Sequence, residues 1–423
     1  MKKKLFAILL AVVMMASVVV VLASCSAPEF DPEIIAKAEK MDLADLEKAA
    51  EEEFKAAGVK FTAKATTSGV GKVLKKFKEK YTWFDYDEFS SSKDQAIAED
   101  ITATLAKNKF FADFSMVQIA SNIKTWTDAG YLRNYVPKND NEIQLDPKAT
   151  APLVGLYADK LFTYNKTAAG DVTLQNIWQL TGKDGATLKK VKGSSIQNPS
   201  NEGINMAFMI MLTSSKSCEK LTAAYKSYFG TDYTAQEGCK NIGYYFIQQY
   251  LKALTENHSS DSKVLSETLQ NDTTGTVFVV GLNKTKGYSH VDKEKNEAGE
   301  EKVVKNYWYD DLFYSGVHGD VEGYNGFTYN TYLSIPKSSR LPYTACLFAR
   351  YILTEEGFRA GWKDVGYSSP NGKVSPNVDK TVSLEGGYKY ELNTDKVLQE
   401  DAAYTLANYN DVYKFVTSNW TAK

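Results

Sequence analysis

The feature that most restricts the fold of this chain is a regular alternation of strand-like and helix-like segments between residues 60 and 129. Polar and apolar residues alternate at 60–65 and at 83–89, as they do in half-buried strands. A third strand is expected at 111–119, followed by a helix near 121–129. Each of the first two strands is followed by apolar residues at helical spacing, which predict one helix with Val70, Val73, Leu74 and Phe77 on one face and a second with Ile97, Ile101 and Leu105. Ser90, Ser91 and Ser92 are expected to cap the second helix. This alternation predicts βαβ units and a largely parallel sheet.

The remainder of the chain is less regular. Its apolar run at 276–282 is continuous and therefore predicts a fully buried strand. The charged stretch at 286–305 predicts an exposed loop or hairpin. Further expected elements are extended pieces at 154–157, 161–165 and 327–335, a helix-rich stretch at 201–253, and helices at 342–360 and about 395–418.

The N-terminus has the pattern of an export signal. Three lysines at positions 2–4 precede an uncharged apolar run at 5–22, and the small residues Ala23 and Ser24 follow. A basic start, a short apolar segment and a small-residue cleavage region are typical of a secretory signal, residues 1–24 here. About 18 apolar residues can also span a bilayer, so a plain transmembrane anchor is the alternative.

The sequence Leu22-Ala23-Ser24-Cys25 resembles the lipobox of bacterial lipoproteins. The resemblance implies cleavage before Cys25, lipidation of its thiol, and attachment to the periplasmic or cell-surface side of the bacterial membrane. Residues 25–57 are then expected to be a tether. Two prolines open this segment, and a charged helix that ends at Gly58 follows. We expect the tether to be a solvated spacer with one weak apolar stripe.

Charge and size restrict the function of the mature chain. Without the three signal lysines it carries 47 basic and 52 acidic residues. This slight acidity argues against a nucleic-acid partner, which requires a concentrated basic surface. A mature chain of about 400 residues can bury a large core and is expected to divide into two domains or lobes.

The order of the segments resembles that of the type II periplasmic (family 1 extracellular) solute-binding proteins. The likeness is carried by residues 59–68, 161–166, 325–337 and 343–358, the last of which ends in Tyr-Ile-Leu-Thr-Glu-Glu-Gly-Phe. It implies an α/β fold of two lobes, each with a mixed, mostly parallel sheet flanked by helices, and a ligand cleft between the lobes. The implied boundaries are 58–155 plus 321–423 for lobe 1 and 156–320 for lobe 2.

The resemblance also implies a function. Proteins of this family capture a small polar solute between their lobes and deliver it to the permease subunits of an ABC importer. Binding shifts the population toward the closed form, because only that form contacts the solute from both sides. We therefore expect a monomeric lipoprotein that has no cofactor and no catalytic activity.

The candidate ligand-binding residues are polar or aromatic side chains near predicted strand ends and crossings. In open α/β sheets, ligands bind at the carboxyl ends of strands, where loops enter helices. Hydroxyl and amide side chains at such ends either contact a ligand or cap a helix, and aromatic side chains either line a site or pack in the core. The candidates are Thr66, Thr67, Ser68, Ser91, Ser92, Gln118, Tyr157, Asn198, Asn205, Tyr324, Asn325 and Phe327.

A metal site is not favoured by the sequence. The histidines lie in polar segments without a second ligand at motif spacing. Ferric-ion receptors of this superfamily typically place two adjacent tyrosines after a buried strand of the second lobe. The matching segment 279–284 has no tyrosine, although Tyr244 and Tyr245 are adjacent in an earlier helix. A ferric-ion-binding receptor of the same fold therefore stays an alternative.

A second alternative is a lipid-anchored secreted hydrolase. Asp310 with Asp311, or Glu355 with Glu356, could serve as acid and base. Adjacent residues on a helix point in different directions, so Glu355 and Glu356 fit a solvated helix face better.

Three cysteines remain once Cys25 is lipidated. Cys218 and Cys239 lie 21 positions apart and could form a disulfide in an oxidising compartment or stay as independent thiols. Cys346 shares a helical face with Ala349 and Leu353, which predicts a position in the core.

Overall fold

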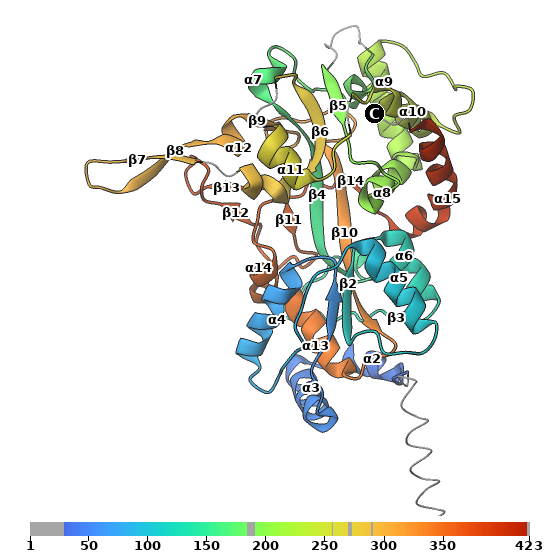
Figure 1. The fold of residues 1–423 in the computed structure, drawn as a ribbon, viewed down its shortest axis with the longest axis vertical. Helices are drawn as coiled ribbons and strands as arrows, with labels where there is room; N and C mark the ends of the chain where they lie inside the picture. Colours follow the sequence, from blue (N-terminus) through green and yellow to red (C-terminus); the bar gives the residue numbers. More distant parts are fainter. Residues whose placement is uncertain (1–28, 184–190, 256, 270–272, 289–290, 421–423) are drawn as a thin grey trace, which may run out of the picture. The chain divides into compact units, whose positions relative to one another are not determined.

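The computed structural model describes residues 29–183, 191–255, 257–269, 273–288 and 291–420, and the predicted signal and lipidation site at Cys25 lie outside them. The chain forms two compact units (Figure 1). Unit 1 consists of the described parts of Met1–Val117, Trp126–Lys138 and Leu333–Tyr351. Unit 2 consists of those of Gln118–Thr125, Asn139–Tyr332 and Ile352–Lys423.

Unit 1 is built on a small mixed sheet. β1 (Ala63–Ala65) runs parallel to β2 (Phe114–Val117), with Ala63 opposite Phe114. β2 neighbours β10 (Gly326–Pro336), whose last residues belong to this unit and pair antiparallel with β3 (Leu132–Arg133). The parallel β1–β2 pair, joined through helices, confirms one βαβ unit. The expected largely parallel sheet is not observed, because most of the described strand pairs of the sheet are antiparallel.

Helices cover this sheet as the sequence pattern predicts. α4 (Gly69–Lys80) buries the four apolar residues that define its predicted face. One of them, Phe77, is fully buried and meets Phe84 and Phe348 edge-to-face at centroid distances of 4.7 and 5.3 Å. The other helices are α5 (Asp94–Leu105), α6 (Ala120–Asp128) and α13 (Pro342–Leu353), the last two of which are shared between the units.

Two local predictions in unit 1 are wrong. Residues 83–89 do not form a strand, because only the single parallel bridge between Phe61 and Tyr86 pairs them with the sheet. The chain then turns, and the Ser92 N–H donates to the Ala65 carbonyl at 3.0 Å. Since Lys93 is the N-cap of α5, the serines at 90–92 do not cap that helix.

The expectation of a solvated spacer at 25–57 is also wrong for its described part. α2 (Glu33–Ala38) and α3 (Leu43–Ala57) bury Ile35, Ala38, Leu46 and Ala50. Glu53 on α3 accepts hydrogen bonds from the Tyr343 and Thr344 N–H groups, at 3.0 and 2.9 Å, at the start of α13. The apolar stripe of this helix therefore packs on unit 1.

The sheet of unit 2 centres on β4 (Val154–Asn165), one continuous strand where the sequence predicts two pieces. β4 pairs antiparallel with the first part of β10, with β6 (Thr276–Gly281), with β9 (Leu312–Tyr314) and with β11 (Tyr367–Ser368). β5 (Gly193–Ser195) runs parallel to β6, and β14 (Leu398–Gln399) runs parallel to β10. All residues of β6 are buried, which confirms the prediction from its apolar run.

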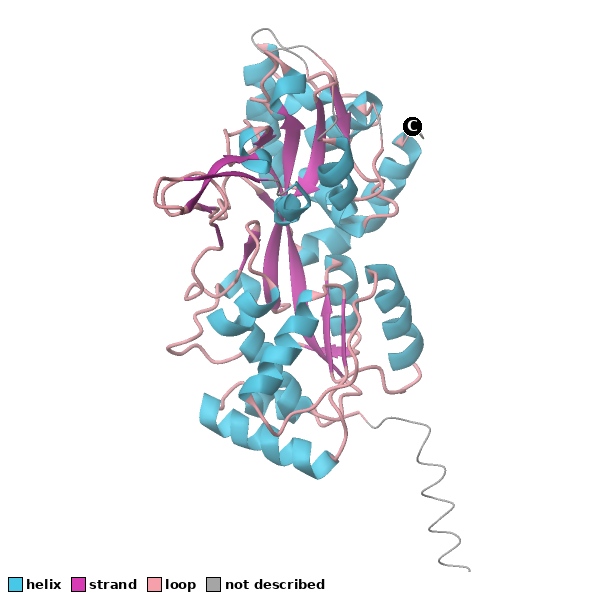
Figure 2. Cartoon of the chain, turned by 60° about the vertical axis from the view of Figure 1, so that its left-hand side comes forward, coloured by secondary structure: helices cyan, strands magenta, loops and turns pink. Residues whose placement is uncertain are grey.

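Helices lie on both sides of these strands (Figure 2). The predicted helix-rich stretch contains α8 (Gly203–Leu212), α9 (Ser215–Phe229) and α10 (Ile242–Ala253). The predicted helix at 342–360 is two helices, α13 and α14 (Glu355–Gly361), because the Thr354 side chain accepts the Gly357 N–H and starts a new helix. The short helices are α7 (Lys166–Ala169), α11 (Asp261–Lys263) and α12 (Tyr307–Asp310).

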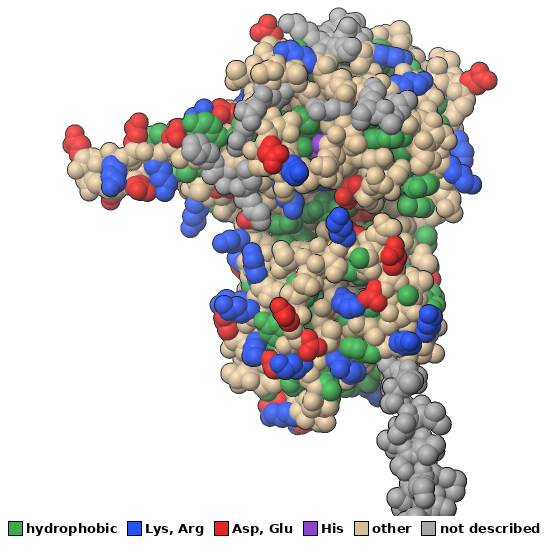
Figure 3. All heavy atoms as spheres, viewed as in Figure 1, with side chains coloured by type: hydrophobic (Ala, Val, Ile, Leu, Met, Phe, Trp, Pro, Cys, Tyr) green, Lys and Arg blue, Asp and Glu red, His purple; other side chains and the backbone are tan. Residues whose placement is uncertain are grey.

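The charged stretch forms a β-hairpin of β7 (Val291–Lys295) and β8 (Glu301–Asn306). Figure 3 shows acidic and basic side chains mixed along it, at the left of the view. Most of its residues are exposed, so the hairpin alternative for this stretch is the one observed. A second small pair is β12 (Val378–Asp379) with β13 (Tyr388–Lys389).

The two units divide the chain differently from the lobe boundaries expected from the sequence. Residues 118–125, 139–155 and 321–332 and the described part of 352–423 belong to unit 2, whereas the sequence assigned them to lobe 1. The C-terminal helix α15 (Ala402–Asn419) packs on α8 and α10, and the Phe415 ring meets Tyr244 edge-to-face at 4.9 Å. These apolar contacts between segments distant in the sequence hold the C-terminal helix on unit 2.

The three cysteines beyond the signal are all free thiols in the structure. Cys218 and Cys239 are half-buried and unpaired, which is the second of the two alternatives for them. Cys346 is fully buried on α13 beside the core, as its helical face predicts.

Candidate functional site

Unit 1 brings two of the predicted hydroxyl residues together at the end of β1. Ser68 and Ser91 line an open groove of about 700 Å³ that also contains Lys72, Lys75 and Tyr86. Thr67 accepts the Gly69 N–H at 3.3 Å and thus supports the start of α4. The Thr66 hydroxyl oxygen is buried without a hydrogen-bond partner among the described residues.

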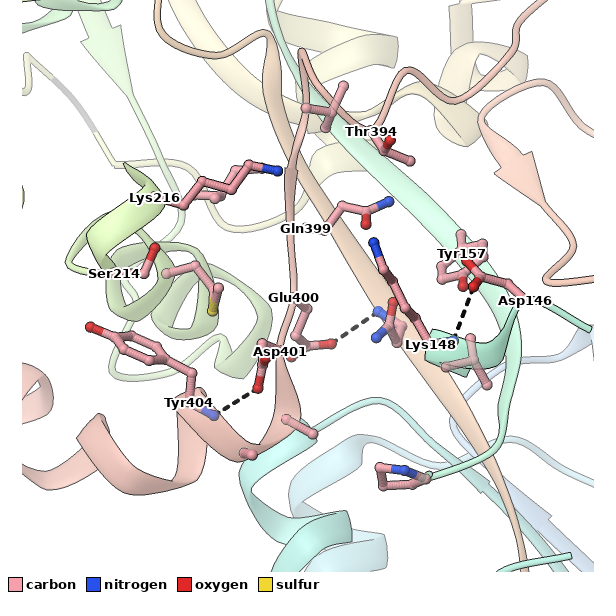
Figure 4. Close-up of a pocket in the computed structure, with 18 of the residues that line it drawn as sticks. Asp146, Lys148, Tyr157, Ser214, Lys216, Thr394, Gln399, Glu400, Asp401 and Tyr404 are labelled. Carbon is pink, nitrogen blue, oxygen red and sulfur yellow. Dashed lines mark hydrogen bonds between the residues drawn. The ribbon is translucent and has the colours of Figure 1, made fainter. Parts of the chain in front are cut away.

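A second cavity, of about 600 Å³, lies within unit 2 (Figure 4). Its floor comes from two neighbouring strands. Asn330 pairs with Tyr157 and Tyr332 pairs with Val154 across β10 and β4, which places these four side chains side by side. The floor therefore depends on the pairing of segments that are more than 150 positions apart in the sequence.

The walls of this pocket come from three other places. The start of α9 supplies Ser214, Lys216 and Ser217, and the 3-10 helix Pro147–Ala149 supplies Lys148, with Asp146 just before it. β14 and the start of α15 supply Gln399, Glu400, Asp401 and Tyr404. Tyr324, one of the predicted site residues, lines the pocket and donates to the Ser217 hydroxyl at 3.3 Å.

The most buried carboxylate of the pocket is that of Glu400, which is 8% exposed. It accepts the Asn330 N–H at 3.0 Å and the Tyr332 hydroxyl at 3.3 Å. Burial and this carboxylate raise the pKa of Tyr332 well above its usual value. Burial and Asp146 likewise raise the pKa of Tyr157. Both phenols therefore keep their protons at neutral pH and can donate hydrogen bonds.

A buried polar network lies elsewhere in unit 2. The Lys160 amine donates to the Asn205 side-chain oxygen at 3.0 Å and lies 3.3 Å from Asp261. Ser195 shares a 2.9 Å hydrogen bond with His258, whose other ring nitrogen is 3.6 Å from Asp261. Burial alone would raise the pKa of Asp261, but Lys160, His258 and the Gly281 N–H hold it at about 2. Asn205 thus joins a network that stabilises the interior.

The remaining candidates serve the structure in other ways. Asn325 accepts the Val321 N–H at 2.7 Å and donates to Asp320 at 2.9 Å, which closes a turn. Phe327 is fully buried and packs against Phe208 at 5.6 Å. Asn198 accepts the Ser200 N–H at 2.9 Å within a turn. Gln118 and Ser92 line neither of the two cavities.

The acids considered for catalysis have structural partners. Asp310 accepts the Asn306 N–H at 2.7 Å, and Asp311 pairs with Lys305 at 2.9 Å. Glu355 pairs with Arg359 at 2.9 Å along α14. Each of these carboxylates supports a local element, and none of them lines either cavity.

Sequence reasoning found Tyr157 and Tyr324 in the pocket but missed most of its other residues. Asn330 and Tyr332 lie two positions apart on a predicted strand and therefore on the same face of it, which is a signal that could have marked them together. Glu400, Lys148 and Lys216 carry no local signal at all. They reach the pocket only because the 3-10 helix Pro147–Ala149, α9 and the segment that joins β14 to α15 pack around the floor.

No protein-family model and no curated protein matches the chain. Among solved structures, a ferric binding protein from Campylobacter jejuni shares 13% identity at a TM-score of 0.56, covering 85% of this chain and 99% of its own. Iron-bound HitA from Pseudomonas aeruginosa shares 14% at 0.55, covering 86% and 100%. Trichodesmium IdiA (FutA) in complex with iron and citrate shares 12% at 0.56, covering 86% and 100%.

The fold is that of the type II periplasmic binding proteins. This confirms the α/β fold class that the sequence predicts. At 12–14% identity, the likeness extends to the type II fold and leaves the ligand to be inferred from the residues of this chain. Within the described residues, none of the helices of this type II fold is both long and apolar enough to span a bilayer.

Proposed function

We propose that the chain is the extracytoplasmic solute-binding subunit of an ABC-type importer and that the pocket of unit 2 holds its solute. The observation that carries this proposal is a cavity of about 600 Å³, lined by phenol, hydroxyl and amide groups, within a type II fold. Cavities of this size with aromatic walls and a few polar groups are typical of small-molecule sites. The proposed role is capture and delivery of the solute without turnover.

A polar organic solute fits the pocket better than a bare ferric ion does. Burial raises the pKa of Tyr157 and Tyr332, so without a metal ion both phenols are protonated, and the Tyr332 hydroxyl already donates to Glu400. Tyr244 and Tyr245 lie on α10 outside the pocket. Across the described part of the chain, no group of three or more His, Cys, Asp or Glu side chains is placed to hold a metal ion.

Replacement of Tyr157 by alanine is expected to weaken solute binding by roughly 10- to 100-fold, since it removes a hydrogen bond and an aromatic contact from the floor. Native mass spectrometry of the purified protein would identify a co-purifying solute. Calorimetry with that compound, or with the best compound from a broad solute panel, would then give the affinities.

Tyr409→Ala is the matched control for this substitution. Tyr409 lies on α15 outside the pocket and stacks on Tyr413 at 5.6 Å. The control should bind with the affinity of the wild type. Unchanged affinity in Tyr157→Ala would refute the pocket as the solute site, and a protein that binds no solute of the panel would refute the proposed function.

We also propose that Cys25 anchors the protein to the membrane through lipid, as the lipobox resemblance implies. On expression in a bacterial host, the wild type should partition into the detergent phase of a Triton X-114 extraction, and Cys25→Ser should stay in the aqueous phase. Cys239→Ser, which removes a half-buried thiol of the mature chain, should behave as the wild type. Equal partitioning of Cys25→Ser and the wild type would contradict the anchor.

A further inference from the structure

The pocket of unit 2 contains three acidic side chains, and each is already engaged by the protein itself. Asp146 accepts the Lys148 N–H at 2.9 Å. Asp401 accepts the Tyr404 N–H at 2.8 Å and caps α15. Glu400 accepts the Asn330 N–H and the Tyr332 hydroxyl. The negative charge of the pocket is thus partly neutralised by backbone donors before any solute arrives.

Three basic side chains line the pocket, and one of them, Lys124, already interacts with another group of the protein. Lys148 and Lys216 line the pocket, and the amine of neither forms an ion pair or hydrogen bond with any described residue. In Figure 4 the two side chains extend toward Gln399, Lys216 from the start of α9 and Lys148 from the 3-10 helix Pro147–Ala149. The pocket therefore presents two ammonium groups from different elements, both available to a guest.

Positive charge is also concentrated around the start of α9. Burial lowers the pKa of Lys220, and the neighbouring charges of Lys216 and Lys396 lower it further, against the opposing effect of Asp395. The N-terminus of this 15-residue helix adds its partial positive charge beside Ser214 and Ser217. An anion at this wall of the pocket would relieve the repulsion among the lysines.

We propose that the solute is an organic anion whose carboxylate or phosphate group binds Lys148 and Lys216. This inference rests on the proposed function and names the class of its solute. The uncharged body of the solute contacts the phenols of Tyr157 and Tyr324 on the floor and wall. Charge-assisted hydrogen bonds to ammonium groups supply the selectivity against neutral analogues of the same shape.

The test uses thermal-shift and calorimetric titration of the full-length protein with a panel sorted by charge. Glucose, glucuronate and glucose 6-phosphate share one sugar ring and differ in that the first is neutral, the second carries a carboxylate and the third a phosphate. Dicarboxylates, amines and ferric citrate complete the panel. We expect the tightest binding from anionic members and weaker binding at high ionic strength. The affinities for the carboxylate and phosphate compounds show which of the two anion types the pocket binds more tightly.

Substitutions of the two lysines then test whether their ammonium groups bind the anion. Lys148→Gln and Lys216→Gln should each weaken binding of the tightest anion about 10-fold, and the double variant about 100-fold. Lys226→Gln/Lys414→Gln is the matched control, because it removes two positive charges from exposed positions of α9 and α15 outside the pocket. The control should keep the wild-type affinity.

The outcomes separate the inference from the function on which it rests. Tightest binding of a neutral or cationic member, or anion binding unchanged in the double variant, would overturn the anionic class and leave solute capture standing. Failure of every class to bind would overturn the proposed function itself. Loss of anion binding in the double variant alone, with the same melting temperature without solute, supports the two-lysine site.

Discussion

Replacement of Asp113 by alanine is expected to lower the free energy of unfolding by about 3 kcal/mol. Asp113 is fully buried in unit 1, and its carboxylate accepts the N–H groups of Thr62 and Arg340 at 2.9 and 2.8 Å. It also binds the Arg340 guanidinium at 2.9 Å. Loss of one partner of a buried pair costs about 3–5 kcal/mol, because the other charge stays behind without compensation. Arg340 is 35% exposed and can be rehydrated, which favours the lower end of this range.

Urea denaturation followed by circular dichroism measures this effect. Asp87→Ala is the matched control, since the exposed Asp87 accepts a 2.6 Å hydrogen bond from the same residue, Thr62. The control should lose no more than about 1 kcal/mol. A loss of similar size in both variants would contradict a special role for the buried carboxylate.

Asp159→Asn is expected to remove most of a decline in stability between acidic and neutral pH. Asp159 is fully buried on β4, and burial raises its pKa from 3.8 to about 7, against the effect of a hydrogen bond from Thr328. In the unfolded chain the same group ionises near its ordinary value. The folded protein therefore holds the extra proton between these two pKa values, and its stability falls as pH rises from about 4 to about 7.

The size of this decline follows from the shift in pKa. A shift from 3.8 to about 7 corresponds to about 4 kcal/mol, fully present as stability below the unfolded pKa and lost above the folded one. Asparagine has nearly the same shape, keeps an acceptor for Thr328 and cannot ionise. We therefore expect Asp159→Asn to match the wild type near pH 4 and to exceed it by up to about 4 kcal/mol near pH 8.

The measurement is urea denaturation of both proteins across this range of pH. Glu53 in unit 1, whose pKa burial also raises to about 7, contributes a slope of the same sign to both proteins. The difference between the two curves isolates Asp159. Asp232→Asn, at an 82% exposed side chain of unit 2, should leave the slope unchanged. Parallel curves for Asp159→Asn and the wild type would refute the buried, protonated carboxyl.

Local patterns predicted many elements correctly where one face of the element is buried. The α4 stripe that contains Phe77, the apolar β6 and the charged hairpin all have an environment that follows from the adjacent sequence. The strand expected at 83–89 shows the opposite case. Its alternation of apolar residues is real, and Phe84 is buried, but the segment gains only one bridge to the sheet. Side-chain burial in a loop produces the same local pattern as a strand does.

The residues of the candidate site were also predicted correctly only in part. Tyr157 and Tyr324 were found because aromatic residues near a predicted crossing are plausible walls for a site. Asn325 and Phe327, chosen on the same argument, close a turn and fill the core. Glu400 and Lys216 were missed, because an exposed lysine or a single glutamate before a helix has no distinctive sequence pattern.

The sequence by itself determined the α/β class and most elements with a buried face, since periodicity and apolar runs act over a few neighbouring residues. Only the tertiary structure decided that α3 packs on unit 1, that α15 belongs to unit 2, and that Lys148 and Lys216 line one pocket beside β4, β10 and β14. Those features arise from strand pairing and helix packing between segments up to about 290 positions apart, as between Glu53 and Thr344. The free energy of such contacts depends on the whole fold, so no short stretch of sequence contains it.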